Sequence, residues 1–157
     1  MSKTTPATLA LTRAGVAFTV HTYDYDPDAD SIGLAAAAAL GESPSRVLKT
    51  LMTLVDGRPV CVILPSDREV SMKKLAAAAG GKSATMMKPA DAERMTGYKV
   101  GGISPFGQRK RVSTVLEASA AAEPYVYLNG GQRGLQVRMS PADLMTAAEA
   151  TATEVAA

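Results

Sequence analysis

The chain has 157 residues, enough to bury a substantial core, and its length fits a single domain, which we place at residues 1–157. With 46% hydrophobic and 20% charged residues, its composition excludes an intrinsically disordered protein. The formal net charge of +2 is too small to indicate nucleic-acid binding by itself.

Signals for targeting, metal binding and nucleotide cofactors are missing from the sequence. No apolar run approaches the roughly 20 residues that cross a bilayer, and the polar, Thr-rich start does not resemble an export signal. One cysteine, Cys61, rules out an internal disulfide framework, and one histidine, His21, rules out the clustered ligands of a zinc site. Neither a phosphate-binding loop nor a dinucleotide fingerprint occurs. We therefore expect a cytoplasmic protein with no metal, no cofactor and no membrane partner.

The start of the chain predicts two helices with a strand between them. A helix is expected over residues 4–15, followed by a β-branched and aromatic strand over residues 16–23. The acidic residues 24–30 then form a loop. Ser31 caps a second helix, which an alanine block carries to Gly41.

The middle of the chain predicts a hairpin followed by three short elements. Two apolar runs, at residues 47–55 and 59–64, flank Asp56-Gly57, and this dipeptide between apolar runs is a strong signal for a two-residue turn. A short helical turn is expected before them, at Ser43-Pro44. The later pattern predicts a helix, a strand and a helix over residues 72–79, 83–87 and 89–95.

The last third predicts a glycine-rich loop, a second hairpin and a final helix. A strand at residues 111–116 follows the loop. Residues 125–128 and 135–139 pair around Asn129-Gly130-Gly131, and Ser140 caps the last helix. The Ala/Thr-rich tail, about residues 150–157, is expected to be poorly ordered. Interspersed helices and strands with two hairpins indicate an α+β (mixed α/β) fold, with a sheet that is mixed rather than wholly parallel.

The stretch Gly101-Gly102-Ile103-Ser104-Pro105-Phe106-Gly107 is the first candidate for a functional site. Its glycines leave the backbone bare enough for another molecule to approach, and consecutive N–H groups can converge on an anion or a developing oxyanion. The basic residues Arg109, Lys110 and Arg111 come directly after it and would attract phosphate. Taken alone, the stretch fits a tight turn with a solvated basic tail equally well.

Lys49 is the most informative single residue. It lies in Val47-Leu48-Lys49-Thr50-Leu51-Met52, a predicted strand with apolar residues on both faces, which is typical of a central strand buried on both sides. Burying an unpaired ammonium group is unfavourable. Lys49 is therefore paired, or directed into a cleft where it meets a ligand, or extended to solvent from the strand end.

The chain offers no clear nucleophile of its own. Cys61 lies in the middle of an apolar strand, the usual setting of an inert core thiol, and His21 stands alone. Ser104 lacks the Gly-x-Ser-x-Gly elbow of an activated serine. The second glycine-rich stretch, Asn129-Gly130-Gly131-Gln132-Arg133-Gly134, is explained by a hairpin turn unless it lies beside the first. The residues alone thus indicate a cytosolic α/β domain with a candidate anion-facing cleft.

Four stretches together resemble the YbaK family. They are His21-Thr22-Tyr23 before the acidic loop, Val47-Leu48-Lys49-Thr50-Leu51, residues 96–107, and Asn129-Gly130-Gly131-Gln132-Arg133-Gly134-Leu135. The family contains free-standing Cys-tRNA(Pro) deacylases and is related to the editing domain of prolyl-tRNA synthetase. The likeness covers nearly the whole chain, and it implies one editing domain with a largely antiparallel, curved sheet flanked by helices.

The resemblance implies a trans-editing enzyme that hydrolyses mischarged Cys-tRNA(Pro). Lys49 matches the family's essential lysine. In the implied reaction, the cysteinyl thiol attacks its own ester carbonyl, so the chain supplies positioning, charge and donors for the carbonyl oxygen. The implied substrate-binding residues are Tyr23, Ile32, Thr50, Gly101, Gly102, Ile103, Ser104, Pro105, Asn129, Gly130 and Gly131. Arg109, Lys110 and Arg111 are expected to contact phosphates at the acceptor end of tRNA, and prolyl-tRNA synthetase is a further candidate partner.

Three positions depart from the family pattern. An aromatic residue is common where Ile32 stands, a carboxylate where Gln136 stands, and a serine where Asn129 stands. Because of these changes, the edited amino acid could be alanine or another small residue, as in Ala-tRNA(Pro), in place of cysteine. A further alternative is a non-catalytic module that binds a tRNA end or a synthetase, which predicts salt-sensitive RNA binding without ester cleavage.

Overall fold

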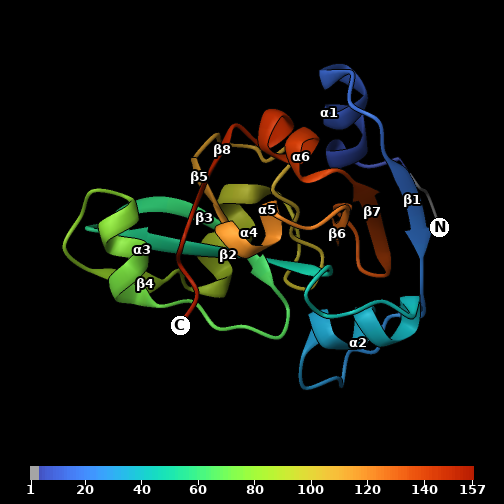
Figure 1. The fold of residues 1–157 in the computed structure, drawn as a ribbon, viewed down its shortest axis with the longest axis horizontal. Helices are drawn as coiled ribbons and strands as arrows, with labels where there is room; N and C mark the ends of the chain where they lie inside the picture. Colours follow the sequence, from blue (N-terminus) through green and yellow to red (C-terminus); the bar gives the residue numbers. More distant parts are fainter. Residues whose placement is uncertain (1–3) are drawn as a thin grey trace.

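A computed structural model describes residues 4–157 as six helices and eight strands (Figure 1). The helices are α1 (Pro6–Ala14), α2 (Ile32–Leu40), α3 (Met72–Ala78), α4 (Pro89–Thr96), α5 (Ala118–Ala121) and α6 (Pro141–Ala148). The strands are β1 (Thr19–Thr22), β2 (Leu48–Val55), β3 (Arg58–Pro65), β4 (Ala84–Met86), β5 (Ser113–Glu117), β6 (Val126–Asn129), β7 (Leu135–Met139) and β8 (Ala150–Thr153).

The strands divide between two sheets. One has the order β1-β7-β6, and the other has the order β4-β2-β3-β5-β8. The β3–β5 and β5–β8 pairs are parallel, and the other pairs are antiparallel. An isolated bridge joins Val47 to Tyr127, where Tyr127 N–H donates to the Arg46 carbonyl at 2.7 Å, so the sheets meet where β2 begins. The α+β class with mixed, mostly antiparallel pairing is confirmed.

Local signals explain the first hairpin and the helix starts. Asp56 and Gly57 adopt φ angles of 50° and 81°, as a tight turn between β2 and β3 requires. Ser31, Ser71 and Ser140 each accept a hydrogen bond from a backbone N–H three residues on, which caps α2, α3 and α6. None of the helices within residues 4–157 is long and apolar enough to cross a bilayer.

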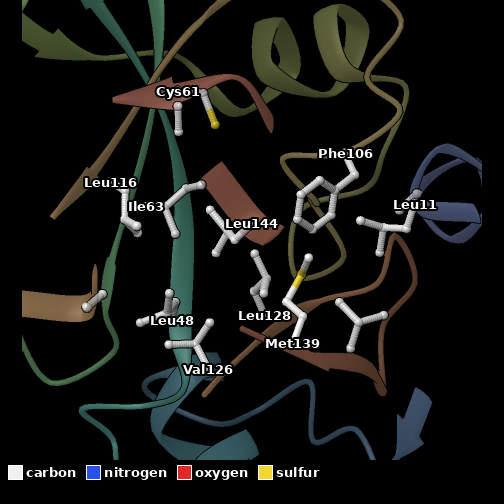
Figure 2. Packing of buried hydrophobic residues seen from close by; sticks show 14 of the residues in the cluster. Leu11, Leu48, Cys61, Ile63, Phe106, Leu116, Val126, Leu128, Met139 and Leu144 are labelled. Carbon is white, nitrogen blue, oxygen red and sulfur yellow. The ribbon is translucent and has the colours of Figure 1, made fainter. Parts of the chain in front are cut away.

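The main core lies between the two sheets (Figure 2). Leu48, Ile63 and Leu116 from the five-stranded sheet belong to the same buried cluster as Leu128 of β6. Phe106, only 2% exposed, enters this cluster from the glycine-rich loop. Phe106 therefore anchors the loop after α4 in the core, and this anchor fixes the position of the loop residues that precede Phe106.

The end of the chain corrects one prediction. Residues 150–153 form β8, which pairs in parallel with β5, and Val155 and Ala156 are fully buried. The expectation of a poorly ordered tail from about residue 150 is wrong. The backbone N–H groups of Val155 and Ala156 donate to the buried Glu117 carboxylate, at 3.1 and 3.3 Å. This long-range anchor compensates for the weak local preference of the tail.

Smaller differences concern element ends. The strand predicted from residue 16 begins only at Thr19, and the expected helical turn at Ser43-Pro44 is a hydrogen-bonded turn, not a helix. Helix α5 was not expected, since four residues carry no periodic signal.

Candidate active site

A cavity of about 310 Å³ opens beside the first half of β2. Its walls come from the start of α2, from β2, from the end of β4 and the first half of α4, and from residues 100–103. Asn129 of β6 and Gln136 of β7, which face each other in the strand register, complete it. The cavity thus lies where the two sheets meet, and both glycine-rich segments reach it.

Six of the predicted site residues line this cavity. They are Ile32, Lys49, Thr50, Gly101, Ile103 and Asn129. The remaining lining is mostly apolar and includes Leu48, Leu51, Met52, Met86, Met87, Pro89, Ala92 and Val100, which sequence reasoning did not select. Apolar strand and helix positions carry no signal that separates a cavity wall from a core, so only the fold could identify them.

Lys49 is the charged residue of this lining. Lys49 lines the cavity from β2, its side chain is 21% exposed, and its Nζ lies 3.5 Å from Oε1 of Glu69. The Glu69 side chain is 85% exposed, so the pair reaches solvent and is not sealed in a dry core. Of the alternatives for Lys49, the structure shows a residue that lines a cleft and is paired with an exposed carboxylate.

Asn129 ties the two glycine-rich segments together. Its Nδ2 donates to the Gly101 carbonyl at 3.0 Å, and its Oδ1 accepts from the Gly131 and Gln132 backbone N–H groups at 2.7 and 3.2 Å. A Cβ on Gly102 would lie 3.0 Å from the Arg133 backbone nitrogen, so the two backbones are in close contact at this glycine. The second glycine-rich turn therefore lies beside the first, as a functional role requires.

The rest of the glycine-rich loop turns away from the cavity. Ser104 is fully buried and its Oγ accepts from the Phe106 N–H at 3.2 Å, which leaves its hydroxyl in the core. Pro105 lines a separate cavity of about 240 Å³. Gly130 is buried, and its carbonyl accepts from Thr5 Oγ1 at 2.6 Å. The predicted substrate-binding residues that do not line the main cavity are Tyr23, Gly102, Ser104, Pro105, Gly130 and Gly131.

The three basic residues after the loop also lie outside the cavity lining. Arg109 packs its side chain against Gly97, Lys110 is exposed, and Arg111 forms an ion pair with Glu149 beside the Pro105 cavity. Their contact with tRNA phosphates stays a prediction.

Three buried polar atoms in this region have no hydrogen-bond partner within residues 4–157: Tyr23 Oη, Thr50 Oγ1 and Gln136 Oε1. Thr50 and Gln136 line the cavity, and Gln136 is 4% exposed. Burial raises the pKa of the Tyr23 hydroxyl, and the nearby Gln136 side chain lowers it by less, although the two do not reach hydrogen-bond geometry. Buried polar atoms are normally paired, so these three are exceptions in this part of the structure, and two of them belong to residues of the cavity lining.

Neither reactive side chain singled out from the sequence lines the cavity. Cys61 is fully buried in β3, and burial raises the pKa of its thiol to about 12, as an inert core thiol requires. His21 hydrogen-bonds Thr19 Oγ1 at 2.8 Å and packs edge-on against Tyr127. Within the described residues, no three His, Cys, Asp or Glu side chains gather in a metal-binding group.

Comparison with known sequences relates the chain to tRNA editing proteins. Residues 26–147 match the family model described as an aminoacyl-tRNA editing domain. EbsC of Enterococcus faecalis, assigned as a Cys-tRNA(Pro)/Cys-tRNA(Cys) deacylase, is 34% identical over 113 residues, which cover 71% of this chain and 69% of that protein. A proline–tRNA ligase of Nitratidesulfovibrio vulgaris is 38% identical over 88 residues, which cover 54% of this chain but only 15% of the ligase.

Solved structures show the same fold. The hypothetical protein APE2540 superposes with a TM-score of 0.86 at 25% identity, over 98% of this chain and 100% of that one. A candidate trans-editing enzyme for prolyl-tRNA synthetase superposes with a TM-score of 0.82 at 20% identity, over 99% of both chains.

Proposed function

Because the chain belongs to the aminoacyl-tRNA editing domain family, we propose that it is a trans-editing deacylase that hydrolyses mischarged Cys-tRNA(Pro). The observation that carries the proposal is the position of Lys49, a cationic residue that lines a mostly apolar cavity bordered by glycine-rich backbone. One fixed positive charge in such a setting interacts strongly with an oxygen that becomes negative during reaction.

The cavity suits a small aminoacyl group. Its volume of about 310 Å³ is at the small end of ligand pockets, and Leu48, Met52 and Ile103 offer apolar contacts to a short side chain. Lys49, Thr50 and Gln136 supply the polar contacts, which suits the ester and the amino group of an aminoacyl ribose. A thiol or a methyl group fits the apolar wall equally well, so Ala-tRNA(Pro) is the alternative substrate.

The proposed reaction takes its nucleophile from the substrate. The cysteinyl sulfur attacks its own ester carbonyl, the ester carbon–oxygen bond breaks, and the thiol proton passes to the ribose oxygen that leaves. The products are a cyclic thiolactone and free tRNA. Among the residues that the structure describes, the cavity lining contains no His, Cys, Asp or Glu that could act as a base for the hydroxyl of Ser31 or Thr50.

The residues of the chain position the ester and stabilise charge. We assign to Lys49 the stabilisation of the negative charge that develops on the carbonyl or leaving oxygen. Gly101 forms a wall against which the ribose lies. Asn129 holds Gly101 in place through the 3.0 Å hydrogen bond to its carbonyl. We place the reaction in the cytoplasm, with the acceptor end of tRNA as the contact and prolyl-tRNA synthetase as the further partner.

A panel of charged tRNAs tests this function. The purified chain is incubated with Cys-tRNA(Pro), Ala-tRNA(Pro) and Pro-tRNA(Pro), and the loss of the ester is followed against buffer. We expect rapid loss of cysteine only. Loss of alanine in place of cysteine would identify Ala-tRNA(Pro) as the substrate. If no ester is lost faster than in buffer and RNA binding is salt-sensitive, the chain is a non-catalytic binding module.

A second substrate tests the thiol route. S-methyl-cysteinyl-tRNA(Pro) keeps the ester and nearly the same shape, but its sulfur cannot close the ring. We expect its hydrolysis to fall to the rate in buffer. Hydrolysis of both substrates at equal rates would show that water or a residue of the chain attacks the ester.

A further inference from the structure

Tyr25 and Arg133 form a stacked pair at the edge of the cavity. The guanidinium carbon of Arg133 lies 5.4 Å from the centre of the Tyr25 ring. Arg133 Nε donates to the Val100 carbonyl at 2.9 Å, and a Cβ on Gly101 would lie 2.7 Å from Tyr25 Oη. Since Val100 and Gly101 both line the cavity, the pair sits directly on its rim.

The same rim exposes apolar surface. Among residues 4–157, four large hydrophobic side chains are strongly exposed, and two of them, Met86 (48%) and Val100 (43%), line this cavity. Exposed apolar side chains beside a cavity indicate a surface that a ligand covers. Such a rim suits a ligand with an apolar part that stays at the mouth while the rest enters the cavity.

The charges around Tyr25 select the kind of group that fits. Tyr25 lies between Asp24 and Asp26 in the acidic loop, which disfavours a phosphate at this place. No carboxylate among the described residues forms an ion pair with Arg133, so its planar guanidinium remains available. A flat, uncharged aromatic ring can use the guanidinium plane, the tyrosine ring and Val100 together.

We propose that Tyr25, Val100 and Arg133 form a subsite for the terminal nucleobase of the RNA, which stacks against the Arg133–Tyr25 pair while its aminoacyl ribose enters the cavity. This inference rests on the proposed function, because it assumes that the ligand is an aminoacylated RNA end. The subsite holds the last nucleotide by stacking, and the phosphates behind it bind away from the acidic loop.

A fluorescent RNA end tests the subsite. The probe is an acceptor stem–loop with 2-aminopurine in place of its terminal adenine, cysteine attached through a non-hydrolysable 3′-amide, and a dye at the far end. Stacking quenches 2-aminopurine, and the dye reports binding independently. We expect quenching with the wild type, and a Kd about fivefold to a hundredfold weaker with reduced quenching for Tyr25→Leu and Arg133→Gln. Tyr25→Phe keeps the ring and is expected to restore both signals.

The chain offers a matched control. Arg138 stacks over Tyr125 at 4.0 Å, and neither residue lines the cavity, so Arg138→Gln removes a similar pair elsewhere and is expected to change nothing. The subsite is wrong if the wild type binds the probe without quenching it, or if Arg138→Gln and Arg133→Gln have equal effects. If the wild type still deacylates Cys-tRNA(Pro), the proposed function is unaffected by either result. If the wild type neither binds the RNA probe nor deacylates Cys-tRNA(Pro), the proposed function is wrong as well.

Discussion

Lys49 Nζ lies 3.5 Å from Glu69 Oε1, although Lys49 belongs to a central strand and the Glu69 side chain is 85% exposed. An ion pair with one partner this exposed stabilises a protein by only about 0–1 kcal/mol. Glu69 sits in a segment held by residues near the end of the chain, since its carbonyl accepts from the Ala157 N–H at 2.8 Å. A negatively charged ligand can therefore displace Glu69 from Lys49 at small cost and take its place.

We predict that Lys49→Met lowers the kcat of deacylation by about 100-fold or more, because it removes the fixed positive charge of the cavity. The free energy of unfolding is expected to change by less than about 1 kcal/mol, since methionine fits the apolar wall and the lost ion pair is weak. Single-turnover kinetics and urea unfolding measure the two effects. Lys73→Met, on the exposed side of α3, is the control; equal activities for the two variants would contradict this role.

Thr50→Val tests whether the unpaired polar atoms of the cavity serve a ligand. The Thr50 hydroxyl is buried without a hydrogen-bond partner, so its isosteric replacement is expected to raise the free energy of unfolding by about 1 kcal/mol. The same change is expected to lower kcat/KM about tenfold, because substrate loses a hydrogen bond. Thr53, also in β2, donates to the Val60 carbonyl at 2.7 Å, so Thr53→Val should destabilise the chain instead. A Thr50→Val variant that is less stable and fully active would refute the interpretation.

Short-range signals predicted most of the fold. The Asp56-Gly57 turn and the serine caps of α2 and α6 depend on residues close in sequence, and all of them occur as expected. Strand β8 was missed because its partner, β5, is far away in sequence and because alanine and threonine alone do not indicate pairing. The division of the strands between two sheets likewise depends on contacts such as the Val47–Tyr127 bridge, which no local pattern encodes.

The site was predicted in part, for a related reason. Lys49 was recognised because a charge in an apolar strand is conspicuous, and the cavity explains it. Ser104 belongs to the same glycine-rich motif as Gly101, yet Phe106 enters the core and carries Ser104 inward with it. A motif shows that a loop exists but not which of its residues face outward. Tyr25 gave no signal, since its place beside Gly101 arises only when the acidic loop folds against residues 100–101.

Cys61→Ala separates a thiol of the protein from the thiol of the substrate. Cys61 is fully buried and the pKa of its thiol is raised to about 12, so almost no thiolate forms near pH 8. We expect Cys61→Ala to deacylate Cys-tRNA(Pro) at the wild-type rate, with a loss of roughly 1 kcal/mol in unfolding free energy for the removed core atom. Iodoacetamide should leave the folded wild type unmodified at this pH, as mass spectrometry can show. Inactivation by alkylation at Cys61 would contradict this prediction.

Glu117 is expected to make the stability of the chain depend on acid pH. Its side chain is almost fully buried, which by itself raises the pKa of the carboxyl. Hydrogen bonds from Ser119, Val155 and Ala156 outweigh this effect and hold the pKa below its ordinary value of 4.5. Because the folded state favours the charged form, this stabilisation is fully present above the unfolded pKa and is lost as pH falls through the lower folded value.

Glu117→Gln therefore has two expected consequences in urea unfolding measured from pH 7 down to pH 3. At pH 7 the variant should lose about 2–3 kcal/mol, because an amide nitrogen cannot accept the bonds from Ser119 and the charged acceptor is gone. As pH falls from about 4.5, the ordinary value that the unfolded chain keeps, through the lower folded pKa, the difference from the wild type should shrink, because the unfolded wild type binds the proton before the folded one does. Glu154→Gln is the control, because this residue is 73% exposed and pairs only with Lys74 among the described residues. A constant difference between Glu117→Gln and the wild type across this range would show that Glu117 acts by shape and not by charge.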